Sequence, residues 1–148
     1  MADVPRLEHT RKVLKESLRL YPPVFGVLRE PVRDDQIGGY QIPAGATIAM
    51  NQIAVHYEPK FFNDPKAFTP ERWTDSFEES LPQFAYFPFS GGPHRCIGER
   101  FAMLEATLVT ATIAQSYHLE LLSDPNLTLK PSVTTRPDPS EFVRVRVT

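Results

Sequence analysis

The spacing of apolar residues near the start of the chain predicts a helix from Arg6 to Leu20. Asp3 is a candidate N-cap, Pro5 is tolerated in a first turn, and Pro22-Pro23 should end the helix. Four apolar residues recur at helical spacing and are expected to form its buried stripe: Leu7, Leu14, Leu18 and Tyr21.

A second, longer helix is predicted over residues 99–118. Phe101, Leu104 and Leu108 fall on one of its faces, and Met103, Val109 and Ile113 fill others. Because this segment is apolar nearly all round, we expect the helix to be buried.

Between and after these helices the pattern favours strands and irregular chain. Residues 33–42 are typical of a hairpin that turns at Gly38-Gly39, and residues 47–55 of a further apolar strand. A short helix and loop are expected over 61–68, a polar irregular meander over 75–83, and strands over 119–122, 127–129 and 142–147. The fold class is therefore mainly α with small β-sheets (α+β).

Composition narrows the class of protein but not its function. The chain has 148 residues, one domain's worth, and its net charge of -2 favours neither nucleic acid nor an anionic membrane as a partner. No signal peptide or membrane span is visible, and a single cysteine excludes an internal disulfide framework and fits a reducing compartment. Cytoplasmic localisation is the default expectation, and a lost N-terminal membrane anchor stays open. The 15 prolines indicate much irregular chain between elements.

That single cysteine, Cys96, lies in a glycine-rich loop directly before the long helix. A helix N-terminus carries unpaired N–H groups and partial positive charge, so a thiol there should ionise readily. Gly91, Gly92 and Gly98 remove side-chain bulk around the sulfur, which leaves room for a large flat group. A thiolate facing such a group indicates haem.

Two other interpretations of the cysteine remain. A lone cysteine is often a buried, inert small hydrophobe. Zinc binding is disfavoured, because no second cysteine is present and His9, His56, His94 and His118 show no ligand-like spacing.

The segment from Phe89 to Gly98 resembles the cysteine-ligand loop of the cytochromes P-450, the haem-thiolate monooxygenases. In that family a Phe seven residues before the cysteine shields the sulfur, a Gly four before it makes the turn, and an Arg or His two before it binds a haem propionate. The corresponding residues, with those matching after the cysteine, are Phe89, Gly92, His94, Gly98, Ala102 and Glu105. The resemblance implies that Cys96 ligates the iron of haem b.

Two segments that lie far apart in the sequence match a second motif of the same family. Glu16-Ser-Leu-Arg19 resembles its E-x-x-R helix, and Pro70-Glu-Arg72-Trp73 resembles its P-E-R-F segment, with Trp in place of Phe. The implied role of Glu16, Arg19 and Arg72 is a structural ion-pair triad that fixes the meander beside the cysteine loop. Residues 37–45 also resemble the family's small-sheet hairpin.

The resemblance also implies contacts with the second haem propionate, with an electron-transfer partner and with the substrate. Arg29 falls where the family often has an arginine on the second propionate, and Arg95 and Arg100 could meet an acidic electron-transfer partner. Substrate contacts would come from the segment after the E-x-x-R helix and from a turn near the C-terminus: Val24, Phe25, Gly26, Val27, Val133 and Thr134.

The resemblance covers nearly all of the chain but only about the C-terminal third of the family's catalytic domain, so residues 1–148 are expected to form a single partial domain. The implied function is a monooxygenase that inserts one atom of O2 into an organic, lipophilic substrate, with electrons from a reductase or ferredoxin. Two alternatives are a non-catalytic haem-binding fragment that lacks the distal oxygen-activating helix, and a structural or interaction domain in which Cys96 is a free thiol.

Overall fold

The computed structural model describes residues 4–122, 128–130, 134–138 and 144–148. Its first helix, α1, spans Glu8–Leu20 and follows a short 3-10 turn, η1, at Val4–Arg6. The predicted helix is therefore right over most of its length, and it ends as expected before Pro22-Pro23. In its last turn the N–H of Tyr21 donates to the carbonyl of Ser17 at 2.8 Å. The candidate cap Asp3 lies outside the described residues.

The buried face of α1 is not the expected apolar stripe. Leu7, Leu14 and Leu18 are only half-buried and Tyr21 is exposed, whereas Glu16, Arg19 and Leu20 are the buried residues. The prediction followed hydrophobicity alone. Here the charged pair faces inward because the chain that packs on it supplies a full set of hydrogen-bond partners, and satisfied polar groups can be buried.

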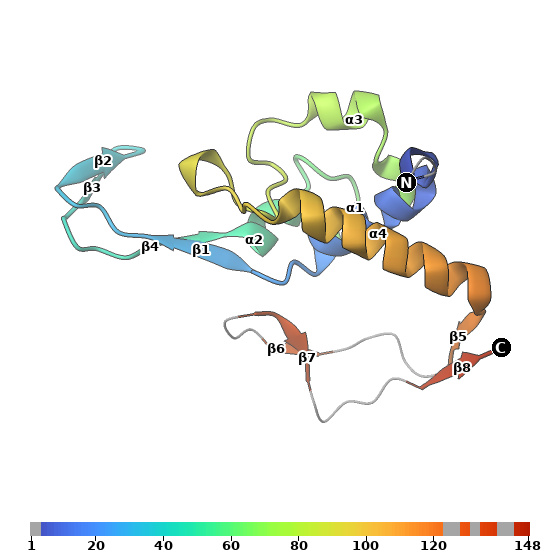
Figure 1. Ribbon diagram of the computed structural model, residues 1–148. Helices are drawn as coiled ribbons and strands as arrows, with labels where there is room; N and C mark the ends of the chain where they lie inside the picture. Colours follow the sequence, from blue (N-terminus) through green and yellow to red (C-terminus); the bar gives the residue numbers. More distant parts are fainter. Residues whose placement is uncertain (1–3, 123–127, 131–133, 139–143) are drawn as a thin grey trace.

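Two antiparallel strand pairs extend from the helices to one side of the molecule (Figure 1). β1 (Gly26–Arg29) pairs with β4 (Ile48–Asn51), and β2 (Asp35–Ile37) pairs with β3 (Tyr40–Ile42) at the far end. The predicted hairpin is confirmed, and its turn has positive φ at both central glycines, +57° at Gly38 and +88° at Gly39. Two successive positive φ values are what a tight hairpin turn of this hand requires.

The predicted strand over 47–55 is wrong in its second half. β4 ends at Asn51, and residues 52–56 form a helix, α2 (Gln52–His56). The side-chain oxygen of Asn51 accepts a hydrogen bond from the N–H of Ala54 at 3.1 Å and so caps this helix. Within α2, Gln52 and His56 are completely buried and lie one turn apart.

The segment after α2 reverses two further expectations. Residues 61–68 form turns and bends, so of the predicted short helix and loop only the loop is present. The predicted irregular stretch 75–83 contains α3 (Asp75–Ser80). Thr74 caps α3 by accepting from the N–H of Phe77, a local signal that the sequence reading missed. Between these elements η2 (Pro70–Arg72) delivers Trp73 into the core, where its ring packs on Phe62.

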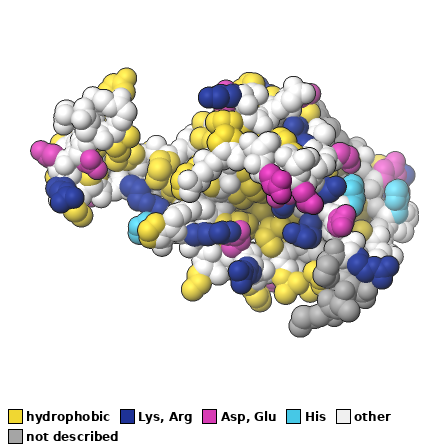
Figure 2. All heavy atoms as spheres, turned by 90° about the horizontal axis from the view of Figure 1, so that it is seen from above, with side chains coloured by type: hydrophobic (Ala, Val, Ile, Leu, Met, Phe, Trp, Pro, Cys, Tyr) yellow, Lys and Arg dark blue, Asp and Glu magenta, His cyan; other side chains and the backbone are white. Residues whose placement is uncertain are grey.

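The long helix α4 spans Glu99–Ser116, close to the predicted bounds, and packs against α1 (Figure 1). Its predicted burial is wrong. Among its residues only Thr107 is buried, and the exposed fraction reaches 71% at Phe101. The prediction assumed that packing partners would surround this apolar helix, but within the described chain much of its surface faces water. Figure 2 shows hydrophobic side chains gathered in the middle of one face of the molecule, among charged ones.

The C-terminal chain forms two small sheets beneath α4 in the view of Figure 1. β5 (Leu119–Leu121) pairs with β8 (Val145–Val147), and β6 (Leu129–Lys130) pairs with β7 (Arg136–Pro137). The predicted strands over 119–122 and 142–147 correspond to β5 and β8, and the one predicted over 127–129 overlaps β6 only at Leu129. The N–H of Thr135 donates to the carbonyl of Pro23 at 2.7 Å and joins this region to the chain after α1. The fold is thus a mixture of helices and small sheets.

Candidate functional site

The glycine-rich loop is held closed by its own backbone. The N–H of Cys96 donates to the carbonyl of Phe89 at 2.9 Å, and the N–H of Arg95 donates to the carbonyl of Gly92 at 3.1 Å across the 3-10 turn η3 (Gly92–His94). Gly92 has a φ of +63°, in the left-handed region that favours glycine. The loop therefore returns the chain to Phe89 and places Cys96 shortly before α4.

The Cys96 side chain is exposed, and little bulk surrounds its sulfur. A Cβ added at Gly98, the N-cap of α4, would lie 3.8 Å from the Cys96 Sγ, so glycine here keeps the space beside the sulfur open. A Cβ at Gly91 would come within 2.3 Å of the Phe84 ring. The glycine at position 91 therefore allows the Phe84 ring to pack against the loop. The arrangement offers one accessible thiol directly before a long helix.

A cavity of about 760 Å³ lies on another side of this loop. It is bordered by α1, α4 and the meander, and neither Cys96 nor His94 lines it. It is therefore not the space that the Cys96 sulfur faces. The lining residues of the loop itself are Phe89, Ser90, Gly91, Gly92 and Arg95.

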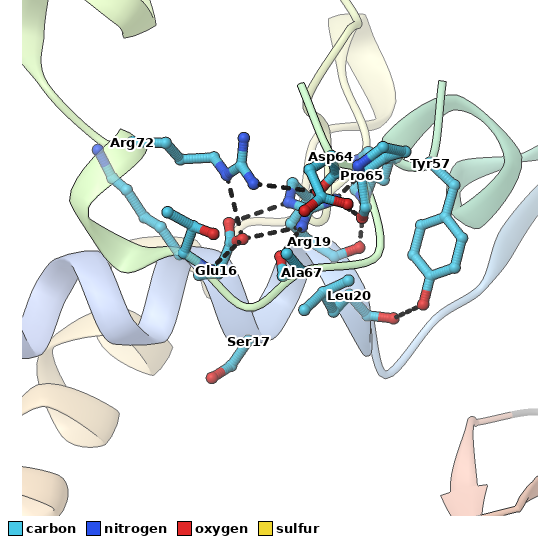
Figure 3. A network of polar contacts seen from close by, with 12 residues as sticks. Glu16, Ser17, Arg19, Leu20, Tyr57, Asp64, Pro65, Ala67 and Arg72 are labelled. Carbon is cyan, nitrogen blue, oxygen red and sulfur yellow. Dashed lines mark hydrogen bonds and ion pairs between the residues drawn. The ribbon is translucent and has the colours of Figure 1, made fainter. Parts of the chain in front are cut away.

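A buried carboxylate organises the chain behind the loop (Figure 3). Glu16 Oε2 accepts from Arg19 Nε and Trp73 Nε1, both at 2.9 Å. Glu16 Oε1 accepts from Arg19 Nη2 at 2.8 Å, from the Thr69 N–H at 2.9 Å and from Arg72 Nε at 3.1 Å. The structure thus brings together the three residues of the expected triad and adds two donors to it.

Arg19 uses all five of its N–H groups. Besides its two bonds to Glu16, Nη1 donates to the carbonyls of His56 at 2.9 Å and Pro65 at 2.6 Å, and Nη2 donates to the carbonyl of Ala67 at 3.1 Å. A fully buried guanidinium is tolerated only with such complete hydrogen bonding. One side chain therefore joins α1 to α2 and to the turns at 65–67.

The electrostatics of the network favour the ionised carboxylate. Burial alone would raise the pKa of Glu16, but the hydrogen bonds from Arg19, Thr69 and Trp73 and the positive charge of Arg19 outweigh it and lower the pKa below the ordinary value. Glu16 is therefore a structural anion held between guanidinium groups, with no free lone pair for acid–base chemistry.

Sequence reasoning missed the contributions of Trp73 and α2. Trp73 was noted only as a departure from the P-E-R-F pattern, yet its indole N–H supplies a bond that phenylalanine lacks. Gln52 and His56 were assigned to a strand, and no local pattern marked them as buried hydrogen-bonding residues. The available signals were the indole nitrogen in place of a hydrocarbon ring and the cap residue Asn51.

The remaining predicted site residues lie on several different elements. Phe89 and Ala102 are half-buried, His94 is exposed on η3, and Arg29 lies on β1, where its Nη1 donates to the carbonyl of Leu28. The bond between Thr135 and Pro23 brings the two predicted substrate segments together. Within them Val24 is exposed, Phe25, Gly26, Val27 and Thr134 are half-buried, and Val133 lies outside the described residues.

The two arginines beside the cysteine differ in their surroundings. Arg95 donates to Glu99 through Nε at 2.6 Å and Nη2 at 2.8 Å, and its hydrogen bonds and charge lower the pKa of Glu99. Because its charge is balanced locally, Arg95 is a weaker attraction for an acidic partner than the sequence suggested. Arg100 is exposed and remains available for such a contact.

Among the residues that the structure describes, no group of three or more His, Cys, Asp or Glu side chains could hold a metal ion. The candidate ligand is thus a single thiol. In the same described ranges no helix has the length and apolar character needed to cross a membrane.

Comparison with known proteins agrees with this geometry over almost the whole chain. Residues 1–144 match the family model of cytochrome P-450. The chain belongs to the cytochrome P-450 family. It is 42% identical over 117 residues to cyclooctat-9-en-7-ol 5-monooxygenase of Streptomyces melanosporofaciens, a match that covers 79% of this chain and 26% of the relative. Thromboxane-A synthase of Sus scrofa is 33% identical over 141 residues, which cover 95% of this chain and 26% of that protein.

Solved cytochrome P-450 structures share the fold. The cytochrome P-450DA heme domain superposes with a TM-score of 0.88 at 33% identity, covering 98% of this chain and 32% of that one. The retinoic acid bound cyanobacterial CYP120A1 gives a TM-score of 0.88 at 34% identity, covering 100% of this chain and 34% of that one. The chain thus spans about a third or less of the length of these cytochromes P-450.

Cytochromes P-450 are haem-thiolate monooxygenases, which hold a haem group through a cysteine thiolate. The residues present in this chain fit a haem group. The Cys96 thiol is accessible, and the glycine at position 98 leaves open the space that a Cβ would occupy beside the sulfur. A flat macrocycle needs that clearance.

Proposed function

We propose that residues 1–148 form one partial domain carrying the cysteine-ligand part of a haem-thiolate monooxygenase, with Cys96 as the residue that would bind the iron of haem b. The observation that supports this most directly is the exposed Cys96 thiol before α4, in a loop closed by the bond from the Cys96 N–H to the Phe89 carbonyl. When bound, haem with a thiolate ligand supplies the O2 activation that inserts one oxygen atom into an organic substrate.

The residues of the loop have distinct proposed roles around that sulfur. Phe89 shields it from water, Gly92 makes the left-handed turn, and Gly98 leaves clearance for the flat group. Ala102, one turn into α4, keeps the helix surface small near the cofactor. Backbone N–H groups of the loop and of the start of α4 are expected to donate to the sulfur and tune the reduction potential. The proposed propionate partners are His94 and Arg29.

The Glu16, Arg19 and Arg72 network is proposed to hold the meander in register with this loop. Its carboxylate is ionised and fully hydrogen-bonded, so it contributes rigidity and no proton transfer. The connection runs through the turns at 63–69, whose carbonyls accept from both arginines.

The proposed substrate is a lipophilic organic molecule. The segment that carries Val24, Phe25 and Val27 begins beside Pro23, whose carbonyl accepts from the Thr135 N–H, and its apolar side chains suit a lipophilic ligand. The electron donor is proposed to be a reductase or ferredoxin that contacts the exposed Arg100 near the loop. Localisation in the reducing cytoplasm would keep the single thiol available.

A second candidate is a haem-binding protein without turnover. Much of the surface of α4, including Phe101 and Leu108, faces water in the described chain, and the chain spans 26% of the length of the relatives from Streptomyces and pig. A chain that leaves this apolar surface open to water could hold haem through Cys96 without turning over a substrate.

The deciding experiment is the carbon monoxide difference spectrum of the reduced, haem-reconstituted chain and two variants. We expect a strongly red-shifted Soret band in the parent, loss of that band in Cys96→Ser, and weaker haem retention with an unchanged band position in His94→Ala. A red-shifted band that persists in Cys96→Ser would overturn the ligand assignment. Spectral binding without product formation would support the second candidate.

A further inference from the structure

Two buried side chains of α2 bind the same residue, one through its backbone carbonyl and the other through its backbone N–H. Gln52 Nε2 donates to the carbonyl of Phe87 at 2.6 Å, and the N–H of Phe87 donates to His56 Nε2 at 3.0 Å. Gln52 and His56 are four residues apart, hence on one face of the helix, and both are completely buried. Phe87 lies two residues before Phe89, at the start of the cysteine loop.

The hydrogen bonds define the tautomer of His56. A backbone N–H can only donate, so Nε2 accepts from Phe87 through its lone pair, and the proton resides on Nδ1. Nδ1 lies 3.2 Å from the carbonyl of Arg19, to which it donates. In return the carbonyl of His56 accepts from Arg19 Nη1. A neutral His56 therefore joins the Glu16 network on one side to Phe87 on the other.

The path continues from Phe87 into the loop. The carbonyl of Phe87 also accepts from the Ser90 N–H at 2.9 Å, and the carbonyl of Phe89 accepts from the Cys96 N–H. The His56 ring lies 5.5 Å from the Phe87 ring, edge to face, which restricts the same residue through its side chain. The position of the Phe87 backbone thus limits where Phe89, and through it the Cys96 backbone, can lie.

Burying the Gln52 side chain at this position lowers the stability of the fold. Its Oε1 is buried and has no hydrogen-bond partner among the described residues. Methionine has a similar volume and could fill the same space without a buried polar oxygen. An unsatisfied buried amide oxygen disfavours folding, so retention of glutamine is explained by the bond that its Nε2 makes to Phe87.

We propose that Gln52 and His56 are positioning residues for Cys96, acting together as a clamp on the backbone N–H and carbonyl of Phe87. This inference rests on the proposed role of Cys96 as haem ligand only for its functional consequence. The mechanical part, that the clamp restricts the loop, concerns this chain's own backbone and can be tested without haem.

The first test is hydrogen exchange of the Cys96 amide in Gln52→Met, measured by NMR in the haem-free chain. Methionine keeps the volume of glutamine, removes the donor to Phe87 and also removes the buried oxygen, so the urea midpoint should stay near that of the parent. We expect exchange at the Cys96 amide to accelerate about tenfold or more, while the Tyr21 amide, bonded to Ser17 on α1, is unchanged. Gln41→Met, the same change at an exposed hairpin site, is the matched control and should alter neither rate.

A second pair of variants tests the histidine. His56→Phe removes both ring hydrogen bonds, whereas His56→Gln can still accept from Phe87 through Oε1 and donate to Arg19 through Nε2. We expect the glutamine variant to restore most of the slow Cys96 exchange that the phenylalanine variant loses. Should His56→Phe fail to fold, the Gln52→Met comparison decides the question alone.

The functional consequence is read in the haem-reconstituted protein. A loosened loop should lower the fraction of the carbon monoxide complex that shows the red-shifted thiolate band, and it should shift the reduction potential of the haem. A variant that only lowered the stability of the fold would not shift this potential. Unchanged Cys96 exchange in both Gln52→Met and His56→Phe overturns the clamp and leaves the ligand assignment standing. Accelerated exchange with no thiolate band in the parent would instead retain the clamp and refute the ligand role of Cys96.

Discussion

The indole N–H of Trp73 donates to Glu16 Oε2 at 2.9 Å, in a site where both side chains are buried. A hydrogen bond to a charged acceptor contributes more than one between neutral groups. Trp73 also packs on Tyr86, with ring centroids 4.5 Å apart, and on Phe62 and Phe77. A single side chain therefore fills the core and satisfies the carboxylate at its centre.

Replacing Trp73 by phenylalanine should lower the free energy of unfolding by about 2–3 kcal/mol, because it removes a bond to a charged group and leaves a smaller ring. Urea unfolding followed by far-UV circular dichroism measures this. Tyr57→Phe is the comparison: it removes a bond to the neutral carbonyl of Leu20 at 3.0 Å and should cost about 1 kcal/mol. Equal losses in the two variants would contradict the special strength of the Trp73 bond.

The two arginines around Glu16 should respond unequally to lysine. Arg19→Lys cannot supply five donors, so it leaves buried carbonyls and one carboxylate oxygen poorly paired, and we expect a loss of about 3–5 kcal/mol or failure to fold. Arg72→Lys removes one bond to Glu16 and two to backbone carbonyls at a partly exposed site, and should cost about 1–2 kcal/mol. The thermal midpoints of the two variants test this order, and a larger loss in Arg72→Lys would refute it.

Acid should destabilise the protein through His56. Burial, with a smaller effect from the charge of Arg19, lowers the pKa of His56 from 6.5 to about 4, despite the bond to the Arg19 carbonyl. Between these values the unfolded chain binds a proton that the folded chain excludes. The stability is therefore complete above pH 6.5 and falls by about 3 kcal/mol as the pH drops towards 4.

The lowered pKa of Glu16 adds a loss of the same sign at lower pH, below its ordinary value of 4.5. Urea midpoints at half-unit pH intervals from 7 to 4 measure the combined profile. In His56→Gln the slope between pH 6.5 and 4.5 should largely disappear, and the part due to Glu16 should remain. A parent profile that is flat above pH 4.5 would contradict the assignment to His56.

The loop glycines should separate backbone strain from steric clearance. Gly92→Ala places a side chain at φ +63° and should cost about 1 kcal/mol, and Gly92→Asn should cost less, because asparagine tolerates this region better. Gly98→Ala, at φ -84°, should leave the thermal midpoint nearly unchanged and reduce the rate at which Cys96 reacts with a bulky maleimide. Comparable destabilisation by alanine at both positions would refute the distinction.

Local patterns predicted the features that depend on neighbouring residues. The Gly38-Gly39 hairpin and the length of α4 followed from turn chemistry and periodicity. Glu16, Arg19 and Arg72 were identified by two short motifs, and the structure brings them into one ion-pair network.

The features that the sequence did not reveal depend on contacts between distant segments. The apolar residues 47–55 suit a strand equally well, and the switch to α2 depends on the Asn51 cap and on burial of Gln52 and His56 against Phe87. The burial of α4 was overestimated because periodicity reports how apolar a helix is and carries no information about which surfaces lie against it.

The exposed apolar residues of α4 have a consequence for handling the protein. Phe101, Leu108, Val109 and Ile113 present hydrocarbon to water over several turns, together with Ile97 just before the helix. Salting-out ions strengthen the attraction between such surfaces. The chain should therefore be retained on a phenyl column at moderate ammonium sulfate and scatter light increasingly as its concentration rises, and mild non-ionic detergent should reverse both.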